Sequence, residues 1–262
     1  MRGRMGVFAC SSCFVIASFH RLHSRDLQYF REFAAQANAA GRSLQDHYLV
    51  IQKVQRNEKG GVHTLSPHEL RGIRLAKEHL APQESCLIMG GGAGGEAAWL
   101  LDHGIRNITC LDISQGLLEV CAKELGIKTL CADMRATKLP DRSFDVVVTH
   151  RSLHHLFYPF AGLEEFARVA RRKVIIINEP IRSGLKSAVR RIRRGRIISA
   201  AGIYEYQFNV DDVSRYMFFS GFRPEAVIRY WETTKGPILN AILNAVFRFA
   251  GNRFTAVYQR LA

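Results

Sequence analysis

The sequence is poor in the features that mark membrane-spanning and disulfide-bonded proteins. No apolar run reaches the roughly 18–20 residues that a bilayer-spanning helix needs. Six cysteines among 262 residues are too few to staple a domain of this size. Three of them, Cys86, Cys110 and Cys131, fall in predicted buried strands, where a free thiol behaves as a small hydrophobe. We therefore predict a soluble protein in a reducing, cytoplasmic compartment.

The first 25 residues lack both a convincing signal-peptide cleavage site and a workable zinc motif. Arg2 and Arg4 precede an apolar stretch, as in signal peptides, but no small-residue cleavage site follows it. Two cysteines and two histidines are separated by only six residues, fewer than zinc-finger loops use. These are Cys10, Cys13, His20 and His23. We predict no metal site, and we interpret residues 1–25 as a disordered extension or as a chain whose start belongs at Met5.

Acidic residues are missing from the most basic part of the chain. Lys and Arg number 37 against 23 Asp and Glu, and half of the net charge of +14 lies in residues 181–196, here called the basic window. Its basic residues are Arg182, Lys186, Arg190, Arg191, Arg193, Arg194 and Arg196. Two interpretations fit this pattern: a solvated lid helix, and a surface that attracts an acidic or phosphorylated metabolite, a lipid head group or RNA.

The hydrophobic periodicity predicts one α/β domain with helices added at its N-terminal side. Two amphipathic helices are expected within residues 24–57, and a capping box of Ser66 and Glu69 predicts another that ends near Leu80. From residue 86 short apolar strands alternate with helices, which favours parallel strands joined by right-handed crossovers. The predicted strands are 86–89, 108–112, 128–132, 144–149, 173–178, 226–228 and 254–258, and the predicted helices centre on 95–103, 115–125, 162–171, 209–219 and 237–249.

These elements divide the chain into residues 1–25 and a single domain at residues 26–262. Within that domain residues 26–82 form a helical cap, and residues 181–206 form a basic, lid-like insertion. The apolar segment 238–247 has two interpretations, association with a membrane surface and burial against the sheet. Burial is the simpler expectation.

Strand 86–89 runs into a turn packed with glycine. Gly90, Gly92 and Gly95 match the G-x-G-x-x-G pattern of dinucleotide sites. With Gly94 in place of Gly95, the same residues match the G-x-G-x-G of methyltransferases that use S-adenosylmethionine. In either case the backbone must turn tightly, and a ligand must approach where a Cβ atom would collide.

The residues after this turn favour the adenosyl interpretation. Glu96 lies in the first helical turn, where it would repel the pyrophosphate of a nicotinamide cofactor, whereas S-adenosylmethionine has no phosphate. Asp112 ends the next predicted strand, and Asp133 follows the third. A dinucleotide site has no use for Asp133, but beside the apolar Met134 it can accept a hydrogen bond from an adenine amine.

Successive motifs resemble those of class I S-adenosylmethionine-dependent methyltransferases, and among them the small-molecule branch. The motifs are residues 86–94, 111–114, 132–134 and 139–148, and residues 152–156 point to the small-molecule branch. The resemblance covers roughly residues 85–230. It implies a Rossmann-like, doubly wound sheet of seven mostly parallel strands with the last one antiparallel, and S-adenosyl-L-methionine as methyl donor.

The resemblance also implies a set of cofactor contacts. They are Gly90, Gly91, Gly92, Gly94, Asp112, Ile113, Asp133, Met134, Thr149 and His150. In this set the glycines line the donor's methionine and ribose, Asp112 binds the ribose hydroxyls, and Asp133 with Met134 holds the adenine edge. The sequence departs from the family pattern at Ile88, where an acid is usual, and at Gly91, where a larger residue is common.

The candidates for a general base are histidines and an acid near the ends of the fourth and fifth predicted strands. Methyl transfer is an in-line displacement from an activated donor, so positioning contributes more than a base does. Histidine can take a hydroxyl proton near neutral pH, and the candidates are His154, His150 and Glu179, with His155 less favoured. The alternatives are that a histidine only packs or caps, and that Glu179 binds backbone amides of the following loop. Tyr204 and Tyr206 fit either pocket walls or core.

These features together predict methyl transfer to a small molecule, at oxygen rather than at nitrogen or carbon, with an acidic or phosphorylated acceptor and a peripheral membrane contact as possible partners. Nucleic acid is disfavoured, because residues 149–152 replace the proline–aromatic tetrapeptide of amino-methylating enzymes and no cysteine nucleophile lies nearby. Two alternatives remain open: an NAD-dependent oxidoreductase, and a non-catalytic module that binds RNA or lipid through its arginines.

Overall fold

A computed structural model describes residues 24–41, 61–182 except 63 and 68, 206–232, 237–246 and 251–262. The expectations for residues 1–23, for the helix within residues 42–57 and for all but the start of the basic window lie outside these residues.

The described elements are α2 (Ser24–Ala39), α4 (Leu70–Glu78), β1 (Cys86–Met89), α5 (Gly95–Asp102), β2 (Ile108–Asp112), α6 (Gln115–Leu125), β3 (Lys128–Cys131), β4 (Phe144–His150), the 3-10 turn η1 (Leu153–His155), α7 (Pro159–Val169), β5 (Ala170–Pro180), α9 (Val210–Phe219), β6 (Phe222–Tyr230), α10 (Pro237–Val246) and β7 (Arg253–Arg260).

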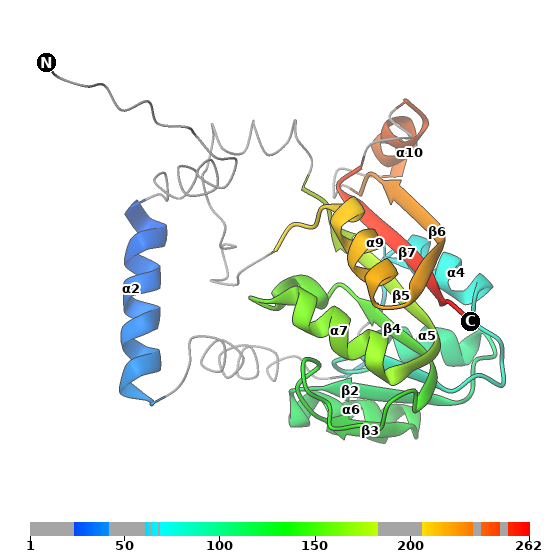
Figure 1. The fold of residues 1–262 in the computed structure, drawn as a ribbon, viewed down its shortest axis with the longest axis horizontal. Coiled ribbons are helices and arrows are strands. Elements are labelled where there is room, and N and C mark those ends of the chain that lie inside the picture. The colour runs from blue at the N-terminus through cyan, green and yellow to red at the C-terminus, as the bar shows by residue number, and fades with distance from the viewer. Residues whose placement is uncertain are drawn as a thin grey trace, which may run out of the picture.

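The strands form one seven-stranded sheet in the order β3-β2-β1-β4-β5-β7-β6 (Figure 1). The pairs from β3 through β5 are parallel, and β7 runs antiparallel to both of its neighbours. This confirms the predicted doubly wound, mostly parallel sheet with an antiparallel last strand. Strands β1 and β2 are buried along their whole length, as continuous apolar runs in the middle of a parallel sheet should be.

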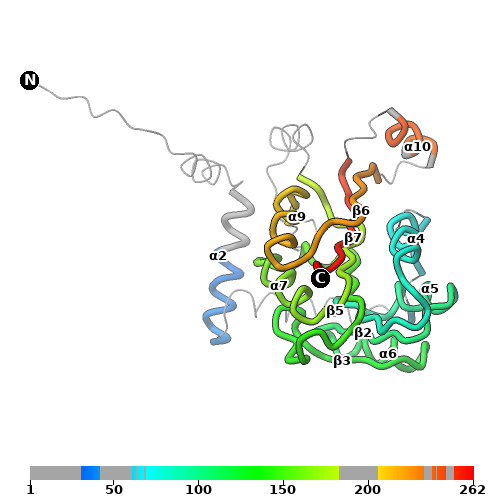
Figure 2. The backbone as a smooth tube through the Cα atoms, turned by 45° about the vertical axis from the view of Figure 1, so that its right-hand side comes forward, coloured from blue at the N-terminus to red at the C-terminus, as the bar shows by residue number. Residues whose placement is uncertain are grey.

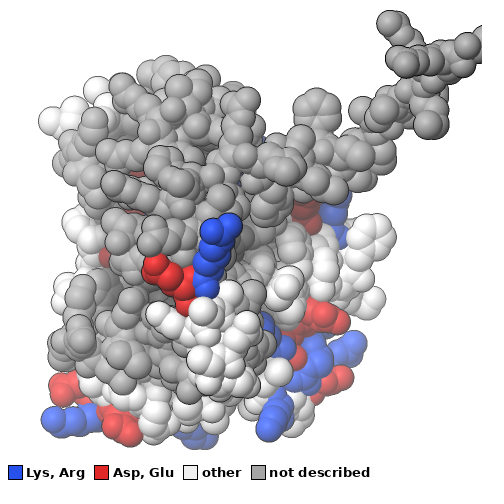
Figure 3. Space-filling model, turned by 90° about the vertical axis from the view of Figure 1, so that its left-hand side faces the viewer, with Lys and Arg blue, Asp and Glu red and all other residues white. Residues whose placement is uncertain are grey.

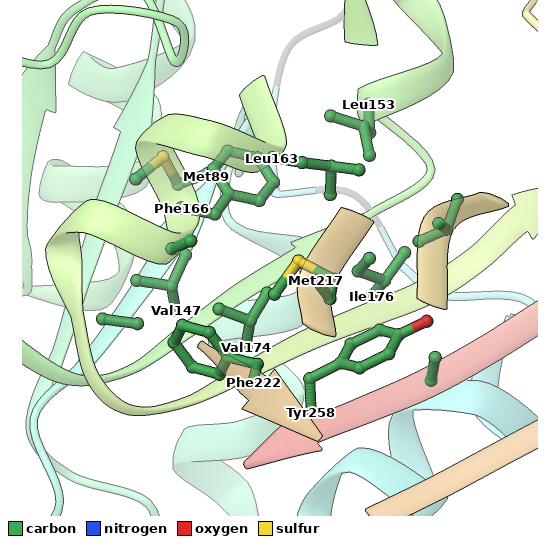
Figure 4. Packing of buried hydrophobic residues seen from close by; sticks show 14 of the residues in the cluster. Met89, Val147, Leu153, Leu163, Phe166, Val174, Ile176, Met217, Phe222 and Tyr258 are labelled. Carbon is green, nitrogen blue, oxygen red and sulfur yellow. The ribbon is translucent and has the colours of Figure 1, made fainter. Parts of the chain in front are cut away.

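Helices cover both faces of the sheet, so the molecule has three layers (Figure 2). Helices α4, α5 and α6 pack on one face, and α7 and α9 pack on the other. Figure 4 shows the core on the α7–α9 side, where Phe166, Met217 and Tyr258 pack against Val147 and Val174 of β4 and β5. The carboxyl ends of β1 to β5 therefore meet at one edge of a rigid sheet, where open α/β sheets bind ligands.

Several element bounds differ from the sequence prediction for identifiable reasons. Helix α4 begins at Leu70, later than a cap at Ser66 predicts, although the Ser66 amide and hydroxyl both donate to the Glu69 carboxylate at 2.8 Å. Strand β6 begins at Phe222, four residues early, because a charged solvent face hid its alternation. The expected burial of Cys131 is wrong: β3 is an edge strand, and this thiol is exposed.

The starts of β1 and β4 are held together by Asp145. The amide and hydroxyl of Ser85 donate to its carboxylate at 2.9 and 2.7 Å, and Arg171 donates to it at 2.6 Å. Burial raises the pKa of Asp145, but the bonds from Ser85 and the charge of Arg171 outweigh burial and hold that pKa below its usual range.

We expect this carboxylate to make part of the stability depend on pH. Because the folded pKa lies below the unfolded one, the contribution is complete above about pH 4 and is lost as pH falls through the folded pKa. Asp145→Asn should therefore lower the free energy of unfolding at pH 7, and its deficit from wild type should shrink in acid. Urea unfolding of both proteins across that range checks this; a deficit that is constant with pH would contradict it.

Candidate active site

The turn between β1 and α5 is a glycine cradle at the carboxyl edge of the sheet. Gly90 and Gly94 have φ angles of +75° and +88°, which L side chains rarely adopt. A Cβ atom on Gly90 would lie 2.4 Å from Ser152 Oγ, and one on Gly94 would lie 2.7 Å from Cys121 Sγ. The surrounding packing therefore requires glycine at both positions, and it leaves backbone rather than side chain facing outward.

Asp112 ends β2 and is tied to this turn. Its carboxylate accepts the Gly92 N–H and the Ser114 N–H, each at 2.9 Å. One bond reaches each oxygen, so each keeps lone-pair capacity for a further donor. The side chain is buried, and Ile113 beside it is half-buried. The acid thus fixes the glycine turn and can still bind a vicinal diol.

Asp133 and Met134 lie just past the end of β3. Arg135 donates to both Asp133 oxygens through Nε, at 3.1 and 3.0 Å. The Met134 methyl group lies close to Gly90, because a Cβ atom on that glycine would come within 2.9 Å of it. The chain thus brings the third strand tip to the glycine turn, and Arg135 is a partner of Asp133 that the sequence patterns did not single out.

Thr149 and His150 end β4 and point to opposite faces of the sheet. Thr149 Oγ1 lies 2.9 Å from Ser152 Oγ, which donates to the Met89 carbonyl at 3.2 Å, on the side of the glycine turn. His150 lies on the α5 side, where its Nδ1 is 2.5 Å from Glu96 Oε1. The sequence prediction placed both residues at the donor's amino group.

A buried hydrogen-bond chain fixes the tautomer of His150. Asn178 Nδ2 donates to the Glu69 carbonyl at 3.0 Å, and that carbonyl can only accept, so the orientation of the amide is set. The same Nδ2 lies 3.0 Å from His150 Nε2, which must then accept, leaving the proton on Nδ1 for Glu96. Both ring nitrogens are therefore used within the protein, and Glu96 is paired rather than open to a ligand.

Asn178 owes its place to an irregularity in β5. Its φ is +56°, and the pairing of β5 with β7 shifts register between Ile176 and Glu179. Asparagine tolerates this left-handed conformation better than most residues. Because of this irregularity, Asn178 contacts His150 and the next residue, Glu179, contacts His154. The same bulge therefore positions one side chain for each of the two histidines.

Glu179 and His154 form a fully enclosed pair. The Glu179 carboxylate accepts the amides of Ser152 and Leu153 at 3.0 Å each, and His154 Nδ1 at 2.7 Å. Burial raises the pKa of Glu179, but the charge and hydrogen bond of His154 and the Leu153 amide outweigh burial and hold it below its usual range. A carboxylate accepts only, so His154 Nδ1 carries a proton and donates it to Glu179. The amides that Glu179 binds belong to the turn after β4 and not to the loop after β5, where the sequence interpretation placed them, and its catalytic role stays a prediction.

An aromatic cluster adjoins the His154 backbone. The Tyr206 amide donates to the His154 carbonyl at 2.9 Å, and its ring meets Phe160 edge-on and Phe208 at 4.9 Å between centroids. Burial, with a smaller effect of Asp212, raises the pKa of Tyr206, so its phenol stays protonated near neutral pH. Tyr204 lies outside the described residues.

These groups fit S-adenosylmethionine better than a dinucleotide. The cradle offers glycine backbone, Asp112 offers acceptors for a ribose diol, and Met134 offers apolar surface near the turn. Glu96 near the start of α5 places an acid where a pyrophosphate would lie. Asn178 and Arg135 were missed in the sequence, since neither belongs to a recognisable pattern, and Ser152 was quoted as part of residues 152–156 without a role at the glycine turn.

Comparisons with known proteins agree with this geometry. The chain's fold is similar to an S-adenosylmethionine-dependent methyltransferase of Mesorhizobium loti (16% identity, TM-score 0.55, covering 74% of this chain and 99% of that one). It is also similar to the magnesium protoporphyrin IX methyltransferase of Synechocystis with bound SAH (17% identity, TM-score 0.54, covering 83% of this chain and 98% of that one). A third similar structure is the [4+2]-cyclase SpnF (15% identity, TM-score 0.55, covering 83% of this chain and 94% of that one). A search of curated proteins found no match.

The structural similarities alone show the fold, as the cyclase among them illustrates. The reaction class comes from a sequence comparison, in which residues 87–177 match the model of a methyltransferase domain family. That range contains the glycine cradle, Asp112, Asp133 and the end of β4. Residues 87–177 therefore carry a methyltransferase domain, and the chain is a methyltransferase that uses S-adenosylmethionine.

Proposed function

We propose that this enzyme methylates a hydroxyl oxygen of a small molecule, with His154 as general base. The observation that carries the proposal is the Glu179–His154 pair, at 2.7 Å and buried at the carboxyl edge of the sheet. A neutral imidazole with Nδ1 held by a carboxylate is arranged to accept a proton at Nε2. A neutral amine acceptor already has a nucleophilic lone pair, so it depends less on a general base than a hydroxyl does.

The cofactor contacts are proposed for the residues gathered at the strand tips. Asp112 would accept from the ribose hydroxyls, Ile113 and Met134 would pack on the adenine, and Asp133 would accept from its amine. S-adenosylmethionine, when bound, supplies an activated methyl group. The chain's own task is then to hold the acceptor oxygen in line, remove its proton through His154, and stabilise the resulting imidazolium through Glu179.

The acceptor is proposed to be small and partly apolar. Tyr206, whose amide bonds the His154 carbonyl, packs its ring on Phe160 and Phe208, and this aromatic cluster favours an acceptor with an apolar body. The basic window, which leaves β5 at the same edge, supports an acidic or phosphorylated substituent, and nucleic acid is not proposed as substrate. Cytoplasmic location is proposed as well, because Cys86, Cys110 and Cys121 are free and buried.

A screen with isotopically labelled donor tests this function. The enzyme would be incubated with fractionated cell metabolites, and labelled products would be identified by mass spectrometry. We expect a methyl ether or ester of a small molecule. Label that enters only RNA, protein or amines would contradict the proposed acceptor class while leaving the reaction class intact.

We propose that Glu96, His150 and Asn178 position the glycine turn rather than touch the donor. Glu96→Ala would leave the buried His150 N–H without its acceptor, at a cost of about 1–3 kcal/mol. Because Glu96 follows the cradle by two residues, we expect a roughly tenfold weaker donor affinity and little change in kcat at saturating donor.

The matched control is Glu96→Gln, which keeps an acceptor oxygen for His150. Calorimetry with S-adenosylhomocysteine should show most of the affinity restored in this variant. If both variants bound like wild type, or if kcat alone fell, a positioning role for this network would be excluded.

A further inference from the structure

Helix α10, the excursion between β6 and β7, presents an apolar face to solvent. Ile238 is 76% exposed and Ile242 is 53% exposed. Ala241 and Ala245, which share this face at helical spacing, are also exposed. Figures 1 and 2 show α10 standing out beyond the end of β6. The simpler expectation, burial of this segment against the sheet, is wrong for these side chains.

The opposite side of α10 is attached to the domain, so its orientation is fixed. Asn244 Oδ1 accepts the Trp231 N–H at 2.9 Å, and Asn244 Nδ2 donates to the Trp231 carbonyl at 3.0 Å. Leu239 and Leu243 are half-buried on the same helix. The isoleucines therefore face outward because the helix is anchored through its other side.

Two segments without acidic residues leave the sheet at this place. Residues 233–250, which include α10, contain Lys235 and Arg248 and no acid. The basic window starts next to them: the Ile181 amide donates to the Asn252 carbonyl, and the Asn252 amide donates to the carbonyl of Tyr230, each at 3.0 Å. On the face seen in Figure 3, by contrast, described acidic and basic side chains lie side by side.

We propose that the α10 face docks on an anionic membrane surface. Exposed apolar patches mark interaction sites, and an apolar helix face with basic residues close to it in the sequence, as Lys235 and Arg248 are, is suited to a lipid interface. Neither signal suffices alone, because two isoleucines bury little area and basic residues give only loose attraction. A second copy of this chain is a poorer occupant, since it would bring together two molecules of charge +14.

The position of α10 gives this docking a consequence for the enzyme. The end of β6 and the start of β7 lie at the edge where β5 delivers Glu179, since Pro180 pairs with Arg253. Docking would therefore turn the acceptor side of the sheet toward the bilayer. Among the described residues no helix could cross a bilayer, and the ten residues of α10 would lie along its surface.

Vesicle flotation of the full chain tests the proposal without donor or acceptor, so its result is independent of the proposed reaction. We expect binding to vesicles of phosphatidylcholine mixed with phosphatidylglycerol, and at least about tenfold weaker binding to phosphatidylcholine alone. Ile238→Asn combined with Ile242→Asn should weaken binding to the mixed vesicles by about tenfold or more. The melting temperature should not change, because both side chains are exposed.

The matched control is Phe219→Asn, which also removes an exposed apolar side chain (87% exposed). Phe219 ends α9 just before the start of β6, whereas α10 follows the end of that strand. This variant should bind vesicles like wild type. Equal binding by wild type and the double isoleucine variant would overturn the proposal, as would no binding to the mixed vesicles. Light scattering that shows a dimer dissociated by the double variant would assign the face to a second copy instead.

Discussion

His154→Asn should lower kcat by about 10²–10⁴-fold with little change in the affinity for the donor. Asparagine keeps an N–H donor near the position of Nδ1, so the bond to Glu179 can persist, while the nitrogen that accepts the proton is removed. The measurement is steady-state kinetics on the acceptor found by the labelling screen, with calorimetry for the donor.

His155→Asn is the matched control, because it makes the same change at the next residue. It should leave kcat close to wild type. If His154→Asn also kept kcat within about threefold, the expected contribution of a general base would be absent. His154 would then have a structural role only, as the partner of Glu179.

Asp112→Asn should weaken binding of S-adenosylmethionine by about 10- to 150-fold. The carboxylate accepts from Gly92 and Ser114 and is proposed to accept from the ribose diol as well. An amide can offer only one oxygen, so it loses a bond to the cradle or to the ribose, and hydrogen bonds to charged groups contribute about 1.5–3 kcal/mol each. Calorimetry with S-adenosylhomocysteine measures the loss.

Asp211→Asn provides the same chemical change at an exposed site, where the carboxylate pairs with Arg229 at the surface. We expect its affinity for the cofactor product to equal that of wild type. The melting temperature of Asp112→Asn shows whether the variant is still folded, so that weaker binding can be assigned to the site rather than to unfolding. Unchanged binding by Asp112→Asn would remove this residue from the cofactor site.

The sheet was predictable from the sequence because its strands are strongly patterned. Apolar runs such as residues 86–89 and 108–112 are buried on both faces and cannot be placed elsewhere in an α/β fold. Prediction was weaker at the edges: β3 exposes Cys131, and β6 carries charged residues on one face. In these edge strands solvent-exposed polar residues interrupt the hydrophobic pattern, so pairing with the neighbouring strand determines where each strand begins.

The candidate site was predictable only in part. The glycines and Asp112 belong to a local motif, so their proximity follows from chain connectivity and the parallel pairing of β1 with β2. His150 is different, since its role depends on Asn178 and on a register shift in β5 that no local pattern encodes. Alternation along β4 could have warned that Thr149 and His150 face opposite sides.

The central claim is that the β1–α5 cradle with Asp112 binds an adenosyl group without a pyrophosphate. Calorimetry of the wild-type chain with S-adenosylmethionine, S-adenosylhomocysteine and NAD tests it most directly. The account predicts saturable one-to-one binding of the first two ligands and none of NAD. Binding of NAD alone, or of none of the three, would contradict it.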